Sequence, residues 1–306
     1  MSVHIVISFV AYLAHALLLP PLLVGFIRKC KARMQDRQGP SIWQPYWDAA
    51  KLLKKSETVS ETATWTFRAA PLALFAAILA AALMVPWLGF ASPMAGDLFL
   101  YIYVIALGKF ATSLAALDTG SSFGALGASR EAALSIQAEP AAVIGLAALA
   151  VHAKSSALSV MLAPGQPGQY LFVVVPLVLA ALWMSSMAEL SRMPIDDPTT
   201  HLELTMIHEA LILENSGRNL ALVEIATGLK MTVIFGLMAQ VLLIAWPRVS
   251  TVIAYIVSLS IIFACGCMVA LAESVLVKLQ WRKIPNLLSF AVAAGALACL
   301  VVAMKG

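Results

Sequence analysis

Eight apolar segments dominate this sequence, and each is long enough to cross a membrane. They fall at about residues 4–27, 69–90, 98–117, 132–152, 170–190, 219–246, 250–277 and 284–304. A bilayer core of ~30 Å requires roughly 20 apolar residues per helix, and lipid offers no partner to unpaired backbone groups. Only 12% of the 306 residues are charged, about half the ~25% usual in soluble domains. We therefore expect an all-α polytopic membrane protein, with residues 1–306 forming a single integral membrane domain.

The distribution of Lys and Arg predicts the orientation of these spans. The connecting segments 28–68, 118–131, 191–218 and 278–283 hold 15 of the 20 Lys and Arg residues. Segments on the opposite side hold three, namely Lys154, Arg248 and Lys305. Because basic residues accumulate on the cytoplasmic side, we expect the four segments to be cytoplasmic and both termini to lie on the non-cytoplasmic side. The first apolar run is long enough to span and lacks a small-residue cleavage site, so no cleavable signal peptide is expected.

The first cytoplasmic segment combines a basic stretch with an amphipathic pattern. Apolar residues recur at helical spacing in this segment, at Trp43, Trp47, Ala50 and Leu53, while the lysines lie at other positions of the expected helix. This arrangement is typical of a helix lying at the membrane interface. The charge pattern alone leaves two roles open, a lipid anchor or a docking site for a soluble subunit.

The segment 118–131 is rich in glycine and serine. Glycines before a helix can cradle phosphate, but no Gly-Lys-Ser/Thr follows here. We expect a flexible re-entrant turn at the membrane face.

Residues 189–224 form the most polar part of the chain, with seven of its 16 acidic residues and two of its five histidines. Pro194 and Pro198 should end one helix and begin another. We predict a polar helix of about four turns from Pro198 to a glycine cap at Ser216–Gly217. His201 and His208 lie seven residues apart, too far for one ion without further ligands, so we expect no metal site. A polar surface against another subunit, which would also include Glu209, is the preferred interpretation.

Ionisable residues also lie inside the apolar segments. A charge at mid-bilayer costs at least ~2.5–3.5 kcal/mol and usually faces a polar cavity or a partner. Each one alone could be a packed, hydrogen-bonded core residue, but a cluster at one depth favours a proton path. The candidates are Lys109, Glu131, Glu139, Glu189, Glu224, Lys230 and Glu273. For Glu189, which has Ser185 and Ser186 on its face, we expect burial to favour the neutral acid.

The four cysteines form no Cys-x-x-Cys pair, and three of them lie in apolar runs. Buried small hydrophobic residues are the expected role. The sequence predicts no iron–sulfur centre and no disulfide framework in this chain.

Several motifs together resemble a known family. They are R-M-Q-D-R-Q-G-P at 33–40, D-A-A-K-L-L at 48–53, L-D-T-G-S and G-A-S-R-E within 117–131, and A-E-L-S-R-M-P-I-D at 188–196 with E-L at 203–204. This combination resembles the membrane heel subunit of respiratory complex I and its hydrogenase relatives, over nearly the whole chain. Where quinone-reducing members carry two further glutamates, this chain has Thr199 and His201. In that respect it is more similar to membrane subunits of energy-converting nickel–iron hydrogenases of the hydrogenase-4 and formate hydrogenlyase type.

The resemblance implies a subunit without a redox cofactor of its own, in a bacterial inner membrane. Iron–sulfur clusters and a nickel–iron centre would be held by soluble partner subunits, and antiporter-like membrane subunits would be further partners; no nucleic acid is expected. It extends the proton path to Asp196, Glu203 and Glu214. The residues expected to dock the soluble partner subunit are Arg33, Arg37, His201, His208 and Glu209.

Two alternatives remain open at this point. A quinone-reactive complex I subunit would line a quinone chamber with the same polar segment. A stand-alone ion-coupled secondary transporter would use the buried charges for solute movement, although no internal repeat of the transporter kind occurs.

Overall fold

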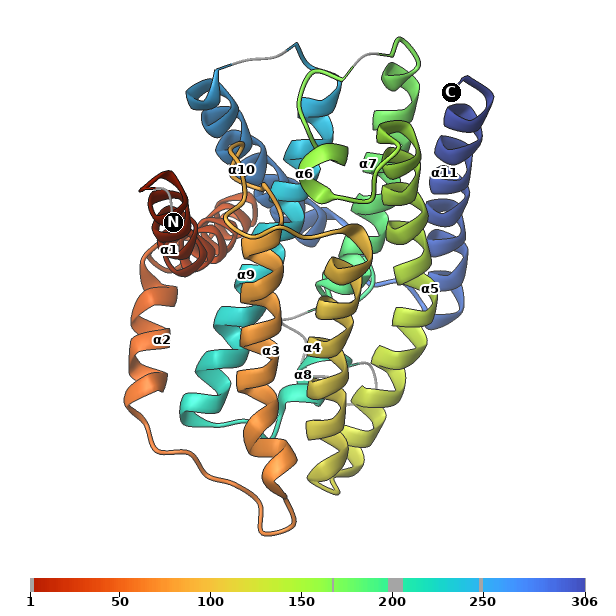
Figure 1. Cartoon of the computed structure of the whole chain (residues 1–306). Helices are drawn as coiled ribbons and strands as arrows, with labels where there is room; N and C mark the ends of the chain where they lie inside the picture. Colours follow the sequence, from red (N-terminus) through yellow and green to blue (C-terminus); the bar gives the residue numbers. More distant parts are fainter. Residues whose placement is uncertain (1–2, 167, 198–205, 248–249, 306) are drawn as a thin grey trace.

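The computed structural model describes residues 3–166, 168–197, 206–247 and 250–305, and within them eight helices are long and apolar enough to cross a membrane. They are α1 (Val3–Met34), α3 (Trp65–Met84), α4 (Leu98–Asp118), α5 (Ser122–Ala153), α7 (Leu171–Glu189), α9 (Gly217–Ile244), α10 (Thr251–Val275) and α11 (Ile284–Lys305). This confirms the predicted all-α polytopic class. Figure 1 shows both termini in the upper half of the view and the connection between α2 and α3 at the bottom.

In the described part of the chain, four short helices connect the spans. They are α2 (Gln44–Lys54), α6 (Leu158–Met161), α8 (His208–Ile212) and the 3-10 turn η1 (Trp281–Lys283). Helix α2 coincides with the predicted amphipathic segment. Its Trp47 and the preceding Trp43 are 70% and 60% exposed, as expected for side chains that lie in a membrane interface.

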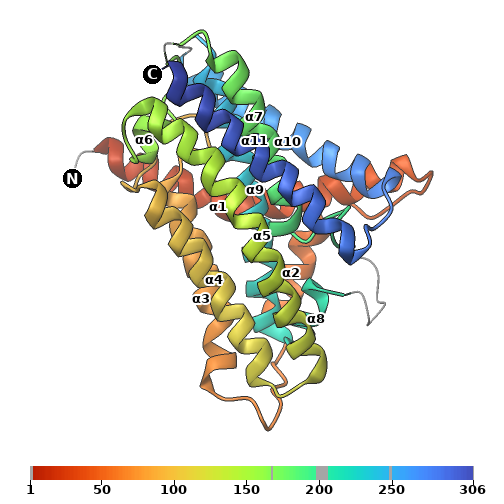
Figure 2. The same cartoon turned by 90° about the vertical axis from the view of Figure 1, so that its right-hand side faces the viewer.

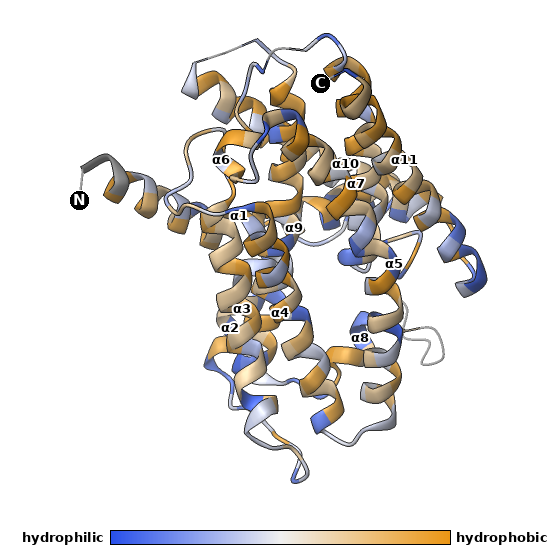
Figure 3. Ribbon diagram, turned by 45° about the vertical axis from the view of Figure 1, so that its right-hand side comes forward, coloured by the Kyte–Doolittle hydropathy of each residue, from blue (hydrophilic) through white to orange (hydrophobic). Residues whose placement is uncertain are grey.

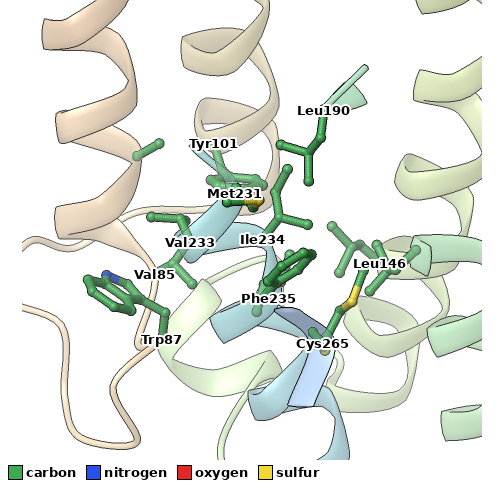
Figure 4. Close-up of a cluster of buried hydrophobic side chains, with 14 of the residues drawn as sticks. Val85, Trp87, Tyr101, Leu146, Leu190, Met231, Val233, Ile234, Phe235 and Cys265 are labelled. Carbon is green, nitrogen blue, oxygen red and sulfur yellow. The ribbon is translucent and has the colours of Figure 1, made fainter. Parts of the chain in front are cut away.

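Helix α9 is the centre of the core, with most of its side chains buried. In Figure 4 its Met231, Val233, Ile234 and Phe235 lie among side chains of the surrounding elements, among them Trp87 and Leu146. A Cβ at Gly236 would lie 2.5 Å from the Trp87 Cβ, so only glycine admits this indole. Figure 2 shows α1 running across α5 and α9, with α10 beside it.

Polar caps fix where α3 and α4 begin and end. Asp97 accepts a hydrogen bond from the Leu100 amide at 2.8 Å and so caps α4. At the other end, Asp118 accepts hydrogen bonds from the Thr64 and Phe67 amides, at 2.7 and 3.2 Å. Side-chain oxygens at helix starts satisfy otherwise unpaired amides, and Asp118 thereby joins the end of α4 to the start of α3.

The predicted re-entrant turn at 118–131 is wrong, because α5 begins at Ser122 and continues to Ala153. The glycines permit close helix contacts here rather than flexibility. A Cβ at Gly124 would lie 2.4 Å from the Ala116 carbonyl oxygen, and one at Gly127 would lie 2.8 Å from the Leu211 amide.

The predicted four-turn helix up to Ser216–Gly217 is also wrong. Pro198 lies outside the described residues, but Met206 and Ile207 are not helical and α8 covers only His208–Ile212. Gly217 does not end a helix; it is the first residue of α9, with φ +51. Its Cβ would lie 2.5 Å from the Ser56 carbonyl oxygen, so the glycine accommodates the segment that follows α2.

Candidate functional site: a buried network of charged side chains

Lys109 of α4 is at the centre of an ion cluster between the spans. Its Nζ donates to Glu189 Oε1 at 2.5 Å, to Glu139 Oε1 at 2.9 Å and to Ser135 Oγ at 2.9 Å. Glu139 and Ser135 are one turn apart on α5, and Glu189 ends α7. Three helices, α4, α5 and α7, therefore converge on one ammonium group.

Lys230 of α9 holds the other side of Glu189. Its Nζ lies 2.8 Å from Glu189 Oε2 and donates to the Glu189 carbonyl oxygen at 2.9 Å. Because α7 ends at Glu189, this carbonyl lacks a helical partner and is free to accept from a side chain. The Glu189 carboxylate is thus held between two ammonium groups.

Glu131 adds a third acid to this inner cluster. It is 9% exposed, and its Oε2 has no hydrogen-bond partner among the described residues. Lys109, Lys230 and Glu189 are all close enough to act on it electrostatically. With three carboxyls and two ammonium groups, the inner cluster is neutral when one carboxyl carries a proton, the state that burial favours.

A small cavity of about 70 Å³ adjoins the inner cluster. Tyr101, Glu139, Ser185, Ser186 and Glu189 contribute polar groups to an otherwise apolar lining. A space of this size is large enough to hold water. The Glu139 side chain is 38% exposed. Its carboxylate therefore lies at the outer edge of the inner cluster, on the flank of the bundle.

An outer cluster surrounds Glu273 of α10. Its carboxylate contacts Lys31 Nζ of α1 at 3.0 Å and Arg192 Nη1 at 2.9 Å. The Glu273 side chain is only 3% exposed. A buried charge is stable only when it is paired. The two ion pairs of Glu273 join α10 to α1 and to the segment after α7. The Glu273 carboxylate therefore lies inside the bundle and does not reach the membrane interface.

Asp196 forms the second half of the outer cluster. Its Oδ1 accepts from Lys278 Nζ at 2.6 Å, and its Oδ2 accepts from the His208 amide at 3.2 Å. Asp196 is 2% exposed. It therefore ties α8 to the connection between α10 and α11, and Figure 3 shows the blue, hydrophilic residues near α8 and the end of α7.

His208 lies between the two clusters. Burial lowers the pKa of its imidazole to about 4; the Asp196 carboxylate opposes this shift, while Lys230 and Arg192 reinforce it. One side chain is thus influenced both by Lys230 of the inner cluster and by Arg192 and Asp196 of the outer cluster. At neutral pH the ring is uncharged and can both donate and accept a hydrogen bond.

A cavity of about 390 Å³ opens beside the outer cluster, between α1, α2, α8 and α9. Charged and imidazole groups contribute to its lining: Arg28, Lys31, Asp48, Arg192, His208, Glu209, Glu224 and Glu273. Water can fill such a polar, open space. The cavity therefore connects the outer cluster and His208 to the exterior.

The structure brings most of the predicted site residues together. The inner cluster contains Lys109, Glu131, Glu139, Glu189 and Lys230, while Asp196 and Glu273 are in the outer cluster and Glu224 lines the cavity. Glu214 is exposed and lines neither the 390 Å³ nor the 70 Å³ cavity. Glu203 and His201 lie outside the described residues.

The predicted docking residues separate into two groups. Arg33 and Arg37 are exposed at and just beyond the end of α1, and Arg37 donates a hydrogen bond to the Gln35 side chain. His208 and Glu209 instead line the 390 Å³ cavity. No group of three or more His, Cys, Asp or Glu side chains that could hold a metal ion occurs in the described part of the chain.

The expectation that Glu189 is a neutral acid is wrong. Burial alone would favour that form, but two ammonium groups contact the carboxylate, at 2.5 and 2.8 Å, and opposite charges at this distance favour the ionised form. The unpaired Glu131 is the better candidate for a protonated carboxyl in the cluster.

Sequence reasoning misses the cations of the outer cluster. Lys31 belongs to a basic stretch that is typical of an exposed surface. Arg192 and Lys278 were used only to predict the orientation of the spans. The partners of these cations lie on other helices, so sequence spacing alone cannot pair them.

The fold and this site define a class: multi-pass membrane proteins whose spans enclose clusters of paired, charged side chains. The family model described as NADH dehydrogenase matches residues 6–304. The chain belongs to this family.

Two relatives from Escherichia coli (strain K12) are similar over most of their length. Hydrogenase-4 component C is 35% identical over 242 residues, covering 78% of this chain and 76% of the relative. Formate hydrogenlyase subunit 4 is 33% identical over 248 residues, covering 80% and 79%. An NADH-quinone oxidoreductase subunit of Syntrophobacter fumaroxidans is 30% identical over 297 residues, covering 88% of each. These relatives are subunits of membrane-bound oxidoreductase complexes.

A solved structure shares the fold. A chain of the membrane-bound sulfane sulfur reductase, described as an archaeal respiratory membrane complex, superposes with a TM-score of 0.81. The match covers 98% of this chain and all of that chain, at 18% sequence identity.

Proposed function

We propose that this chain is the membrane subunit of a respiratory-type hydrogenase complex. It anchors a soluble arm that carries iron–sulfur clusters and a nickel–iron centre, and it couples electron transfer to the movement of protons. The names of the two Escherichia coli relatives support a hydrogenase or formate hydrogenlyase complex. The single observation that supports the coupling role is that two buried charged clusters lie between an open cavity and the flank of the bundle.

The network gives the proton route a definite order. Protons enter the 390 Å³ cavity from the cytoplasm and reach His208 beside Asp196. They pass to the inner cluster, where Glu131 accepts a proton more readily than the paired Glu189. Lys109 contacts both Glu189 and Glu139 and so links the two carboxylates. Glu139 then delivers the proton to a neighbouring membrane subunit at the flank of the bundle. An antiporter-like subunit is the partner of this step.

The soluble arm docks on the cytoplasmic face. Arg33 and Arg37 are exposed there, and both suit an acidic partner surface. In this proposal the chain holds no redox cofactor itself, so the electrons remain in the partner subunits. Movements of the segment around Asp196 and α8 would transmit the redox state of the arm to the outer cluster.

A quinone-reactive subunit is the second candidate function. The observation that favours it is the cavity between α1, α2 and α9, together with the similarity to a relative named as a subunit of NADH-quinone oxidoreductase. In that case the cavity would admit a quinone rather than water alone.

The composition of the native complex tests the proposal. We expect affinity purification of the tagged chain from its membrane to yield soluble subunits that contain iron and nickel, measured by elemental analysis. Hydrogen-linked turnover should proceed without added quinone. Purification of the chain alone, without iron-containing partners, would contradict the proposal and favour a transporter, and quinone-dependent turnover without nickel would establish the second candidate.

A further inference from the structure

A further cavity, of about 1020 Å³, lies between three segments that are distant in the sequence. Its walls come from the start of α5, from residues 193–197 after α7, and from the connection between α10 and α11. The cavity shares Glu273 with the 390 Å³ cavity and so adjoins the outer cluster. Its volume is at the upper end of the range for pockets that hold small organic molecules. The proton route proposed above does not use this space.

Two contacts fix the wall that the connection between α10 and α11 provides. The Leu279 amide donates a hydrogen bond to the Pro194 carbonyl oxygen at 2.8 Å. Next to it, Lys278 Nζ pairs with Asp196 Oδ1 at 2.6 Å. Both contacts tie this connection to the segment after α7, so the wall of the cavity is already formed in the absence of a ligand.

The mouth of this cavity lies where α10 and α11 leave the apolar layer. Helix α10 ends at Val275, and α11 begins at Ile284. Between them, Val277 is 83% exposed, and Leu276 and Trp281 are exposed as well. Tryptophan at the end of a membrane span is typical of the level of the lipid head groups. The cavity therefore opens at that level, with apolar side chains directed to lipid.

The same mouth is basic. Residues 276–283 contain three basic and no acidic side chains, namely Lys278, Arg282 and Lys283. Arg282 and Lys283 belong to η1 and are exposed, and Arg130 of α5 adds a positive charge to the cavity wall. In Figure 3 the end of α11 opposite the C-terminus is blue and lies at the margin of the bundle.

Two carboxylates also line the cavity, Asp197 and Glu273. Glu273 is paired with Lys31 at 3.0 Å and with Arg192 at 2.9 Å, so its charge is already balanced. Asp197 is outnumbered by the basic side chains of η1 and α5. Basic pockets between membrane spans favour anionic head groups, and this excess of positive charge therefore indicates an anionic ligand.

We propose that this cavity binds one anionic phospholipid. Its phosphate group lies at the mouth beside Arg282 and Lys283, and the first part of an acyl chain packs against Leu276 and Val277. A zwitterionic lipid carries no net charge to match this mouth. The bound lipid links α5 to the connection between α10 and α11, next to the outer cluster. The proposal concerns lipid binding and does not depend on the proposed function.

Photoactivatable lipids test the proposal in the native complex, reconstituted into phosphatidylcholine vesicles. A small fraction of the lipid is phosphatidylglycerol with a diazirine near the head-group end of one acyl chain; in a matched sample it is phosphatidylcholine with the same chain. Mass spectrometry of peptides then locates the adducts. We expect adducts on residues 276–284 to be strongly enriched with phosphatidylglycerol. In Arg282→Gln with Lys283→Gln this preference should fall at least about tenfold, because each basic residue near a lipid surface contributes about fivefold.

Two further variants separate a specific site from general contact with lipid. Lys54→Gln with Lys55→Gln removes the same charge from the exposed end of α2 and should keep the preference. Ser129 lines the cavity, so Ser129→Trp should fill it and reduce the adducts without changing the charge. Equal adducts from both lipids in the wild type, or an undiminished preference in Arg282→Gln with Lys283→Gln, would overturn the proposal. Adducts absent from residues 276–284 of the wild type would also overturn it and leave this surface to a protein partner.

Discussion

At the residue scale, His208 is a histidine held uncharged by its surroundings. Burial, together with Lys230 and Arg192, lowers its pKa to about 4 even though Asp196 opposes the shift. An unfolded histidine titrates near ~6.5. The unfolded chain therefore binds more protons than the folded chain between these two values, and the stability contributed by the neutral ring is lost as pH falls through this window.

The variant His208→Gln should remove this pH dependence. We expect the wild-type melting temperature to fall more steeply than that of His208→Gln between pH 6.5 and about 4. Thermal unfolding of the purified protein at a series of pH values measures this. Parallel curves for the two proteins would show that His208 does not titrate as described.

The pairing of Glu189 with two lysines leads to a second prediction at this scale. In Glu189→Gln, Lys230 keeps only the backbone carbonyl of residue 189 as a partner. Removing one member of a buried ion pair costs about 3–5 kcal/mol. We expect a clear loss of thermal stability in Glu189→Gln and a recovery of most of it in Glu189→Gln combined with Lys230→Met. A single variant as stable as the wild type would show that the cluster does not need this charge.

At the element scale, Gly25 decides how α1 meets the segment before α2. A Cβ at this position would lie 1.9 Å from the Ile42 carbonyl oxygen, which is backbone and cannot rotate away. Within α2, Tyr46 donates a hydrogen bond to the Leu18 carbonyl oxygen of α1. The contact between α1 and α2 therefore has no room for a methyl group.

The variant Gly25→Ala should loosen α2 from α1. Alanine normally stabilises a helix by about 1 kcal/mol relative to glycine, but here we expect lower thermal stability and faster proteolysis in the 36–43 segment. Gly228→Ala is the matched control, because its Cβ would meet Pro20 at an ordinary 3.4 Å. Equal proteolysis rates in the two variants would contradict the close contact.

The same scale shows what the sequence could predict. The spans follow from length and hydropathy, and α2 follows from its amphipathic period. The glycines at 124 and 127 suggest flexibility wrongly, because a sequence does not show which backbone approaches a missing side chain. The sequence could predict which residues belong to the inner cluster, because a buried charge requires a partner. The pairs Lys31–Glu273 and Lys278–Asp196 join distant segments and were not predictable.

At the scale of the whole molecule, the predicted orientation places the connecting segments 28–68, 118–131, 191–218 and 278–283 on the cytoplasmic side of the membrane. Ser56 follows α2 and is exposed, while Gln169 precedes α7 and is also exposed. In a cysteine-free background, Ser56→Cys should react slowly with a membrane-impermeant maleimide in intact spheroplasts, and Gln169→Cys should react quickly. The opposite order of rates would invert the orientation and place the termini in the cytoplasm.

The central claim is that the buried network carries protons to the flank of the bundle. Glu139 is the informative position, because Lys109 keeps Glu189 as a counter-charge when Glu139 becomes neutral. Glu139→Gln should therefore leave the complex assembled. Glu214→Gln is the control, since the Glu214 side chain is exposed and lines neither the 390 Å³ nor the 70 Å³ cavity.

The decisive measurement is turnover-driven proton movement in inverted membrane vesicles, followed with a pH-sensitive dye and normalised to assembled complex. We predict that Glu139→Gln slows it at least about tenfold, equivalent to roughly 1.4 kcal/mol in barrier height, while Glu214→Gln matches the wild type. Wild-type proton movement in Glu139→Gln, in a fully assembled complex, would contradict the account.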